Sequence, residues 1–219
     1  ANTARYGGGI ALNVGDSNGY VQVNVFSTDR AQPTRLYGNR ASNTGGAVYA
    51  DARADFATGN EARFCAFDTR FDGNIAQEGS VIYLDTDNFL TDYFGARAHL
   101  NNDSLCDSHP LRVRCGPQDQ CNTIEGNRAE DANGQATSGA VITAQNDAFL
   151  TLGQLIIRDN TGGHVLHGFD DAYTFMHSLL VVGNSTTSDL VRIQDDGGST
   201  ALRDSTLAGN TIGSGNVLS

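Results

Sequence analysis

A four-residue phrase ending in Asn recurs along this chain. Each copy consists of an apolar residue, two further positions and Asn, and in five of the six copies Gly directly precedes the Asn. The copies are LYGN at 36–39, FDGN at 71–74, IEGN at 124–127, IRDN at 157–160, VVGN at 181–184 and LAGN at 207–210. Such self-similarity is typical of a stack of short repeats rather than of a compact sandwich.

The Asn residues set the period of the repeat. With Asn2 as a seventh member, the spacings are 37, 35, 53, 33, 24 and 26 residues. These seven residues are Asn2, Asn39, Asn74, Asn127, Asn160, Asn184 and Asn210. Periods of roughly 20–50 residues indicate a solenoid or a similar array.

Two apolar strands fit between successive Asn residues. One follows a small or Gly pair, as in GGAVY at 45–49, and a second precedes the next Asn, as in FLTLGQLIIRDN at 149–160. A helix does not fit beside two strands in the shortest repeat of 24 residues, which excludes βαβ units. The 26 Gly and 3 Pro, with only 18% charged residues, also favour strands joined by tight turns.

The fold that satisfies this pattern is an all-β parallel β-helix. In it each strand pairs with its equivalent one coil away, at about 4.8 Å. Parallel crossover connections are strongly biased to one hand, which predicts a right-handed solenoid. We therefore expect one β-helix domain over residues 1–219.

The recurring phrase has a physical role in such a stack. The apolar residue three positions before Asn is expected to face the core, and Gly-Asn suits a bend in which positive φ is tolerated. Stacked Asn side chains can hydrogen-bond from one coil to the next and satisfy buried amide groups of the turn. The seven Asn residues are therefore predicted to form one structural column.

Three segments carry a family resemblance. GGAV at 45–48 and FDGN at 71–74 resemble the repeat of bacterial polymorphic outer-membrane proteins. LRDSTLAGNT at 202–211 resembles the strand–turn repeat of secreted right-handed β-helix proteins. The resemblance covers nearly the whole chain except residues 88–121. It implies a right-handed β-helix that is secreted or exposed on the bacterial cell surface, often as an adhesive passenger, on an architecture that also hosts polysaccharide-cleaving enzymes.

The longest spacing, the 53 residues between Asn74 and Asn127, contains a cysteine-rich segment that the other repeats lack. Residues 88–121 include three of the four Cys and are predicted to be a loop insertion that leaves the solenoid. Cys115 and Cys121 bracket a short loop and are expected to form a disulfide, which leaves Cys65 for Cys106. Four Cys allow three pairings, so this connectivity stays open. Zinc is the alternative, although no C-x-x-C pair is present.

An Asp recurs about eight residues after the Gly that opens each strand. These residues are Asp87, Asp147, Asp171 and Asp196. Stacking would place these carboxylates in a column whose mutual repulsion calls for a counter-ion, either Arg or Ca²⁺. The alternative is that Asp starts turns and its side chains point into solvent. Apart from calcium at these residues, no cofactor is predicted.

Two His residues stand three apart at positions 164 and 167. Because residues three apart on a strand point to opposite faces, His164 and His167 are not expected to bind one metal ion together.

Charge and hydropathy limit the partners. The net charge is −11 and all 14 basic residues are Arg, so no basic stripe for nucleic acid is present. No apolar run approaches the roughly 18 residues of a membrane-spanning helix. No segment at either end resembles a cap, so we expect the chain to be part of a longer solenoid, or another chain to cover an end.

Three functions are compatible with this sequence. The favoured one is a non-enzymatic extracellular or cell-surface module, a stalk or adhesive passenger of a longer secreted bacterial protein, with a host or surface glycan or protein as partner. Disulfides would agree with such an oxidising compartment. The alternatives are a carbohydrate-active β-helix enzyme, a polysaccharide lyase or hydrolase, and a calcium-binding structural repeat. No catalytic residue is assigned.

Overall fold

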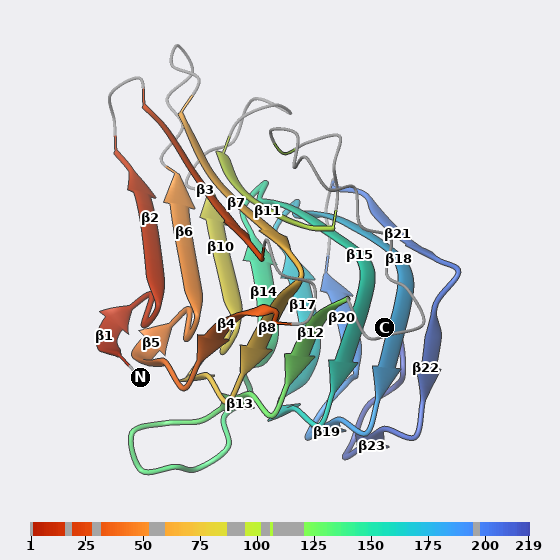
Figure 1. Ribbon diagram of the computed structural model, residues 1–219. Coiled ribbons are helices and arrows are strands. Elements are labelled where there is room, and N and C mark those ends of the chain that lie inside the picture. Colours follow the sequence, from red (N-terminus) through yellow and green to blue (C-terminus); the bar gives the residue numbers. More distant parts are fainter. Residues whose placement is uncertain are drawn as a thin grey trace.

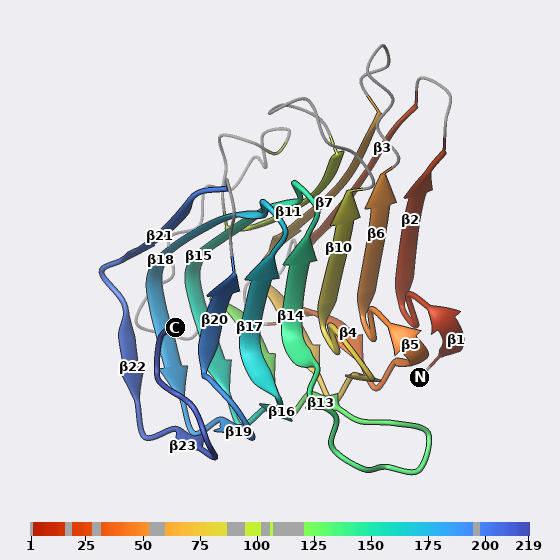
Figure 2. The same ribbon diagram turned by 180° about the vertical axis from the view of Figure 1, so that it is seen from behind.

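The described residues build three β-sheets that the chain visits in a fixed order (Figures 1 and 2). Every pairing between the named strands is parallel, and each strand pairs with equivalents from neighbouring circuits of the chain. The all-β prediction with parallel pairing of equivalent strands is thus confirmed. The computed structural model describes residues 2–15, 19–27, 32–52, 60–86, 95–101, 106, 121–194 and 198–219.

Sheet A contains short strands that begin directly after the recurring Asn residues. They are β1 (Thr3–Tyr6), β5 (Arg40–Thr44), β9 (Ile75–Ala76), β13 (Arg128–Ala129), β16 (Thr161–Gly162), β19 (Ser185–Thr186) and β23 (Thr211–Ile212). The sequence predicted two strands in each repeat and missed these. Most span only two residues, which is too short for an apolar alternation to be recognised.

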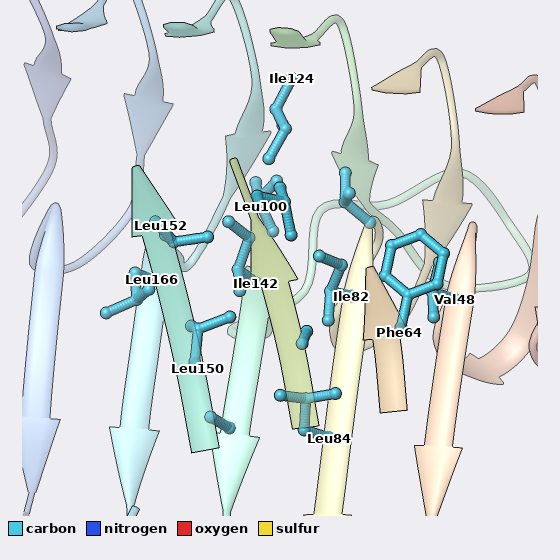
Figure 3. Packing of buried hydrophobic residues seen from close by; sticks show 14 of the residues in the cluster. Val48, Phe64, Ile82, Leu84, Leu100, Ile124, Ile142, Leu150, Leu152 and Leu166 are labelled. Atoms are coloured by element: carbon cyan, nitrogen blue, oxygen red, sulfur yellow. The ribbon is translucent and has the colours of Figure 1, made fainter. Parts of the chain in front are cut away.

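Sheet B holds the strands that follow the Gly or small pairs. They are β2 (Ile10–Val14), β6 (Val48–Ala52), β10 (Ile82–Thr86), β14 (Ala140–Gln145), β17 (His164–Phe169) and β20 (Val191–Gln194). Val48, Ile82, Ile142 and Leu166 occupy one register position across four of these strands. All four are buried, so the apolar side chains stack in a column toward the core (Figure 3).

Sheet C is the largest, and its strands come before the next Asn of each circuit in the sequence. Its strands are β3 (Tyr20–Phe26), β4 (Thr34–Tyr37), β7 (Glu61–Phe67), β8 (Thr69–Asp72), β11 (Gly95–Leu100), β12 (Asn122–Glu125), β15 (Phe149–Arg158), β18 (Tyr173–Val182), β21 (Thr200–Arg203) and β22 (Thr206–Ala208). The apolar residue of the recurring phrase lies here. Phe71, Ile124, Ile157 and Val181 are buried, as the sequence predicted.

The sheet turns a corner partway along each circuit. Asp68, Gln154, Ser178 and Asp204 lie at this corner and all have positive φ. In the third circuit Asn101, the residue after β11, also has positive φ, at 56°. Asp adopts this conformation more readily than most residues because its short polar side chain can hydrogen-bond locally, which explains Asp68 and Asp204 at the bend.

The predicted insertion over residues 88–121 is too wide. Gly95–Leu100 forms β11, which pairs with β7 and β15 in register. Its Ala96, Ala98 and Leu100 are fully buried and alternate with Arg97 and His99 on the outer face. The prediction was wrong here because two of the three inward side chains are only methyl groups. Leu100 pairs with Leu152 and Asn122 pairs with Leu155, so two residues of the next circuit, Gly153 and Gln154, separate the partners of Leu100 and Asn122.

The seven Asn residues lie in one column and hydrogen-bond in sequence order. Each side-chain Nδ2 donates to Oδ1 of the next Asn, at 3.2 Å from Asn2 to Asn39, 3.0 Å from Asn39 to Asn74, and 2.9 Å at each of the four later steps. Backbone N–H groups of the inner Asn residues donate to the same oxygens. Each of the six Asn residues after Asn2 follows a residue with positive φ. Five of these preceding residues are Gly, and the sixth is Asp159.

Candidate functional site

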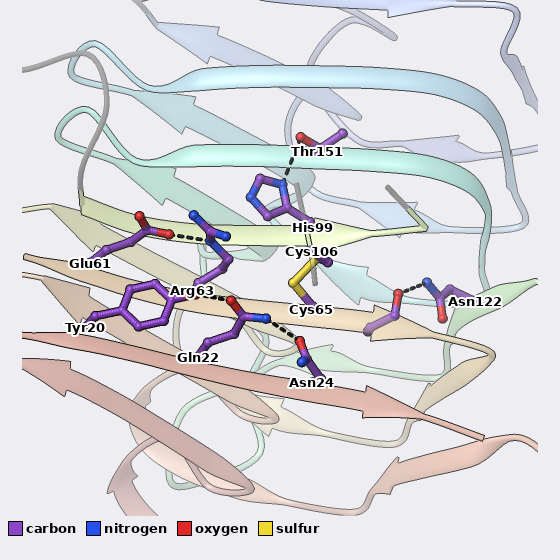
Figure 4. Close-up of a disulfide and its surroundings, with 11 residues drawn as sticks. Tyr20, Gln22, Asn24, Glu61, Arg63, Cys65, His99, Cys106, Asn122 and Thr151 are labelled. Carbon is purple, nitrogen blue, oxygen red and sulfur yellow. Dashed lines mark hydrogen bonds and ion pairs between the residues drawn. A yellow bond between two sulfur atoms is a disulfide. The ribbon is translucent and has the colours of Figure 1, made fainter. Parts of the chain in front are cut away.

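The outer face of the first half of sheet C carries arginine and aromatic side chains from several circuits. Figure 4 shows one part of it, with Tyr20, Arg63 and His99. Alternation along each strand points every second side chain away from the core. One register row consists of Gln22, Arg63, Arg97, Phe149 and Tyr173. The next row along the strands consists of Asn24, Cys65, His99, Thr151 and Phe175. We call these rows, with Tyr20 and Glu61, the arginine–aromatic face.

Aromatic rings form the half of this face nearer the C-terminus. Phe149 stacks against Tyr173 with ring centroids 6.3 Å apart and contacts Phe175 at 5.4 Å. At the opposite side Tyr20 is 56% exposed, and the guanidinium of Arg63 lies 5.6 Å from its ring centroid. Flat apolar surface therefore borders the arginines on both sides.

Arg63 and Arg97 are in register on adjacent strands, but their surroundings differ. Arg63 forms an ion pair with the buried Glu61. Arg97 lies over the ring of Phe149, 5.4 Å from its centroid, and its buried Nε has no hydrogen-bond partner. Burial lowers the pKa of Arg97, the charge of Glu61 raises it and that of Arg63 lowers it again. A guanidinium stays protonated in proteins, so this one carries a half-buried charge.

His99 lies two residues further along β11 on the same face and is fully buried. Its Nδ1 is hydrogen-bonded to Oγ1 of Thr151 at 3.2 Å, whereas its Nε2 has no partner. Burial, and after it the charges of Arg63 and Arg97, lower the pKa of His99 to about 3. The imidazole is therefore neutral at neutral pH.

A disulfide closes over this part of the sheet. Cys65 and Cys106 are bonded, with Cα atoms 6.2 Å apart, and both pack against Phe67. The predicted Cys65–Cys106 pairing is confirmed. Cys121 is also disulfide-bonded. The predicted Cys115–Cys121 bond involves Cys115, which lies outside the described residues.

Beyond the corner, the second half of sheet C carries an ion-pair cluster beside a cleft of 180 Å³. The carboxylate of Glu125 forms an ion pair with Arg158 at 2.7 Å and a second one with Arg70. The buried Nε of Arg70 has no hydrogen-bond partner. Asp72 pairs with Arg35 at 2.5 Å. The acidic groups of this half are thus engaged by guanidinium groups.

Of the predicted calcium ligands, Asp147 and Asp171 lie at turns between sheets B and C. Asp87 and Asp196 lie outside the described residues. Both described residues have positive φ, and the backbone N–H of Asp147 donates to the carbonyl of Asp170 at 3.1 Å. Oδ1 of Asp171 is buried without a partner. Within the described ranges, no three His, Cys, Asp or Glu side chains are grouped to hold a metal ion. Calcium at these residues stays a prediction.

The expectation that His164 and His167 point to opposite faces is wrong. Their ring centroids are 5.0 Å apart. The reason is a bulge, because the N–H groups of Val165 and Leu166 both donate to the carbonyl of Leu190, at 2.9 and 3.3 Å. Nδ1 of His164 is hydrogen-bonded to the carbonyl of Asp189 at 2.9 Å.

Sequence reasoning missed the arginine–aromatic face altogether. Its members come from five circuits, and only the strand register brings them into rows. One signal was available: Arg63 and Arg97 each stand between small or apolar residues, in EARFC at 61–65 and GARAHL at 95–100. Recognising the second segment as a strand would have aligned the two arginines.

Comparisons with models of known families, with curated proteins and with solved structures found no match. In the described part of the chain, no helix has the length and apolar character needed to cross a membrane.

Proposed function

We propose that this chain is a right-handed parallel β-helix module of a longer secreted or cell-surface bacterial protein, and that it binds a glycan on its arginine–aromatic face without cleaving it. The β-helix is supported by three parallel sheets visited in constant order and by the Asn column. The right hand follows from the bias of parallel crossover connections. The Cys65–Cys106 disulfide supports an oxidising compartment.

The observation that carries the binding function is the row Arg63, Arg97, Phe149 and Tyr173. Neighbouring strands lie about 4.8 Å apart, so the row offers a new side chain at each short step along an extended ligand. Aromatic rings provide flat apolar area for the C–H face of a sugar, and guanidinium N–H groups donate to ring oxygens and hydroxyls. An extended saccharide chain fits this alternation of apolar and donor groups.

Binding without cleavage is supported by the state of the carboxylates. Glu61 on the face and Glu125 beyond the corner are both held in ion pairs with arginine. A carboxylate whose oxygens are occupied by guanidinium groups is not one of the two free carboxyl groups that glycoside hydrolysis requires on either side of the scissile bond.

A glycan array with the purified chain tests this proposal. We expect selective binding that the Phe149→Ala, Tyr173→Ala double variant loses. Tyr37→Ala is the matched control, because Tyr37 is a 57% exposed tyrosine of the same sheet outside the face. Absence of glycan binding by the unmodified chain would overturn the binding function. Release of shortened products from a bound glycan would overturn the non-catalytic part.

A further inference from the structure

Arg97 differs from the arginines that form ion pairs. In the described ranges Arg35, Arg63, Arg70, Arg128 and Arg158 each pair with Asp or Glu. The side chain of Arg97 has no ion pair there, and its Nε is buried without a hydrogen bond. Its described neighbours are the ring of Phe149 and the charges of Glu61 and Arg63, and the carboxylate of Glu61 is itself paired with Arg63.

Such an arrangement does not stabilise the protein by itself. A charge removed from water without an ion pair of its own raises the free energy of the folded state, and a like charge on the adjacent strand adds repulsion. An unbranched apolar residue at position 97 would pack on Phe149 without either cost. A role in ligand binding therefore explains the guanidinium of Arg97 better than a role in stabilising the fold.

A second unsatisfied atom lies on the same strand and face. Nε2 of His99 is fully buried and has no partner, while Nδ1 is engaged by Thr151. Buried polar atoms are almost always hydrogen-bonded, and two exceptions so close together mark a site that lacks a ligand group. Because His99 is neutral, the charged side chains of this face among the described residues are Glu61, Arg63 and Arg97, which sum to one positive charge.

We infer that Arg97 binds the carboxylate of an acidic sugar, a uronic acid residue within the glycan. One carboxylate neutralises the single excess charge, and its planar pair of oxygens matches the edge of a guanidinium. The rings of Phe149 and Tyr173 beside Arg97 then contact the apolar face of the same or the next sugar. This assignment rests on the proposed glycan-binding function and names the class of glycan.

The test compares an oligosaccharide that contains glucuronic acid with the same oligosaccharide after its carboxyl groups have been reduced to alcohols. Calorimetric titration should give at least about tenfold tighter binding of the acidic form, as one charge-assisted hydrogen-bonded pair supplies. Arg97→Met should bind both forms equally, with no higher affinity than the unmodified chain has for the reduced form. Arg203→Met removes an exposed arginine of the same sheet and should keep the preference.

Each result is decisive. Equal binding of acidic and reduced forms by the unmodified chain overturns the carboxylate assignment and leaves glycan binding in place. Binding of neither form, together with an array that shows no ligand, overturns the proposed function itself. Tighter binding of a sulfated than of a carboxylated oligosaccharide also overturns the assignment. Thermal unfolding shows whether Arg97→Met is folded, with Arg97→Gln as the second variant. We expect the melting temperature of Arg97→Met to equal or exceed that of the unmodified chain.

Discussion

Asn127 and His99 are both fully buried polar side chains, but their hydrogen bonding differs. In the Asn column, Nδ2 of Asn127 donates to Asn160 and to carbonyls of Phe71 and Glu125, and its Oδ1 accepts from Asn74. On the arginine–aromatic face, one nitrogen of His99 and one of Arg97 have no partner. Buried polar groups with all their hydrogen bonds, such as Asn127, stabilise the fold. Buried polar groups that lack a partner, such as those of His99 and Arg97, do not, and we explain them by ligand binding.

The largest effect is expected from removing the disulfide that closes over the face. The Cys65→Ala, Cys106→Ala double variant should lose about 4 kcal/mol of unfolding free energy, because the bond restrains a long loop in the unfolded chain. The two residues are 41 apart in sequence. Urea unfolding measures the loss. A decrease below about 1 kcal/mol would show that the loop entropy of the unfolded chain is not what this bond restrains.

A smaller loss is expected inside the Asn column. Asn127→Leu leaves the donors of Asn74 and the carbonyls of Phe71 and Glu125 unsatisfied and should cost about 3 kcal/mol. Asn2→Leu is the control, since Asn2 is exposed and donates one 3.2 Å bond to Asn39. It should cost less than about 1 kcal/mol. Equal losses in the two variants would mean that the column is not stabilised through its buried interior.

The pH dependence of stability tests the burial of His99. Its pKa in the folded state, about 3, lies below that of an unfolded His. The unfolded chain therefore takes up a proton first, and stability present above pH 6.5 is lost as the pH falls toward 3. This contributes a decrease of about 2 kcal/mol between pH 7 and pH 5. His99→Asn should remove that part of the slope. An unchanged slope in His99→Asn would place the imidazole in water.

The smallest effect contrasts the two in-register arginines. Arg63→Met leaves the buried Glu61 without its partner and should cost about 1–2 kcal/mol. Arg97→Met removes an uncompensated charge and should stabilise the chain by about 1 kcal/mol. Chemical unfolding at neutral pH measures both variants. Destabilisation by Arg97→Met would show that the guanidinium contributes to the fold after all.

The two regions also differ in how far the sequence predicts them. The Asn column could be predicted because each Asn stands in the same local phrase, and a local phrase repeats visibly. The face could not, because Arg97 and Phe149 belong to different circuits separated by the 102–121 segment. Their contact depends on the register of β11 with β15, which is set by the buried Ala98 and Leu150. The short strands of sheet A were missed because two residues show no period, and the bulge in β17 changed the direction of His164.

The corner of sheet C has a consequence for how this architecture can vary. On one side of it Leu100 pairs with Leu152, and on the other Asn122 pairs with Leu155, so both registers continue across residues 102–121 as if the segment were absent. Lengthening a flexible connection twofold costs only about 0.6 kcal/mol of closure entropy. The corner is therefore a place where peptides of different length and recognition chemistry can be grafted or exchanged beside the arginine–aromatic face while the strands keep their pairing.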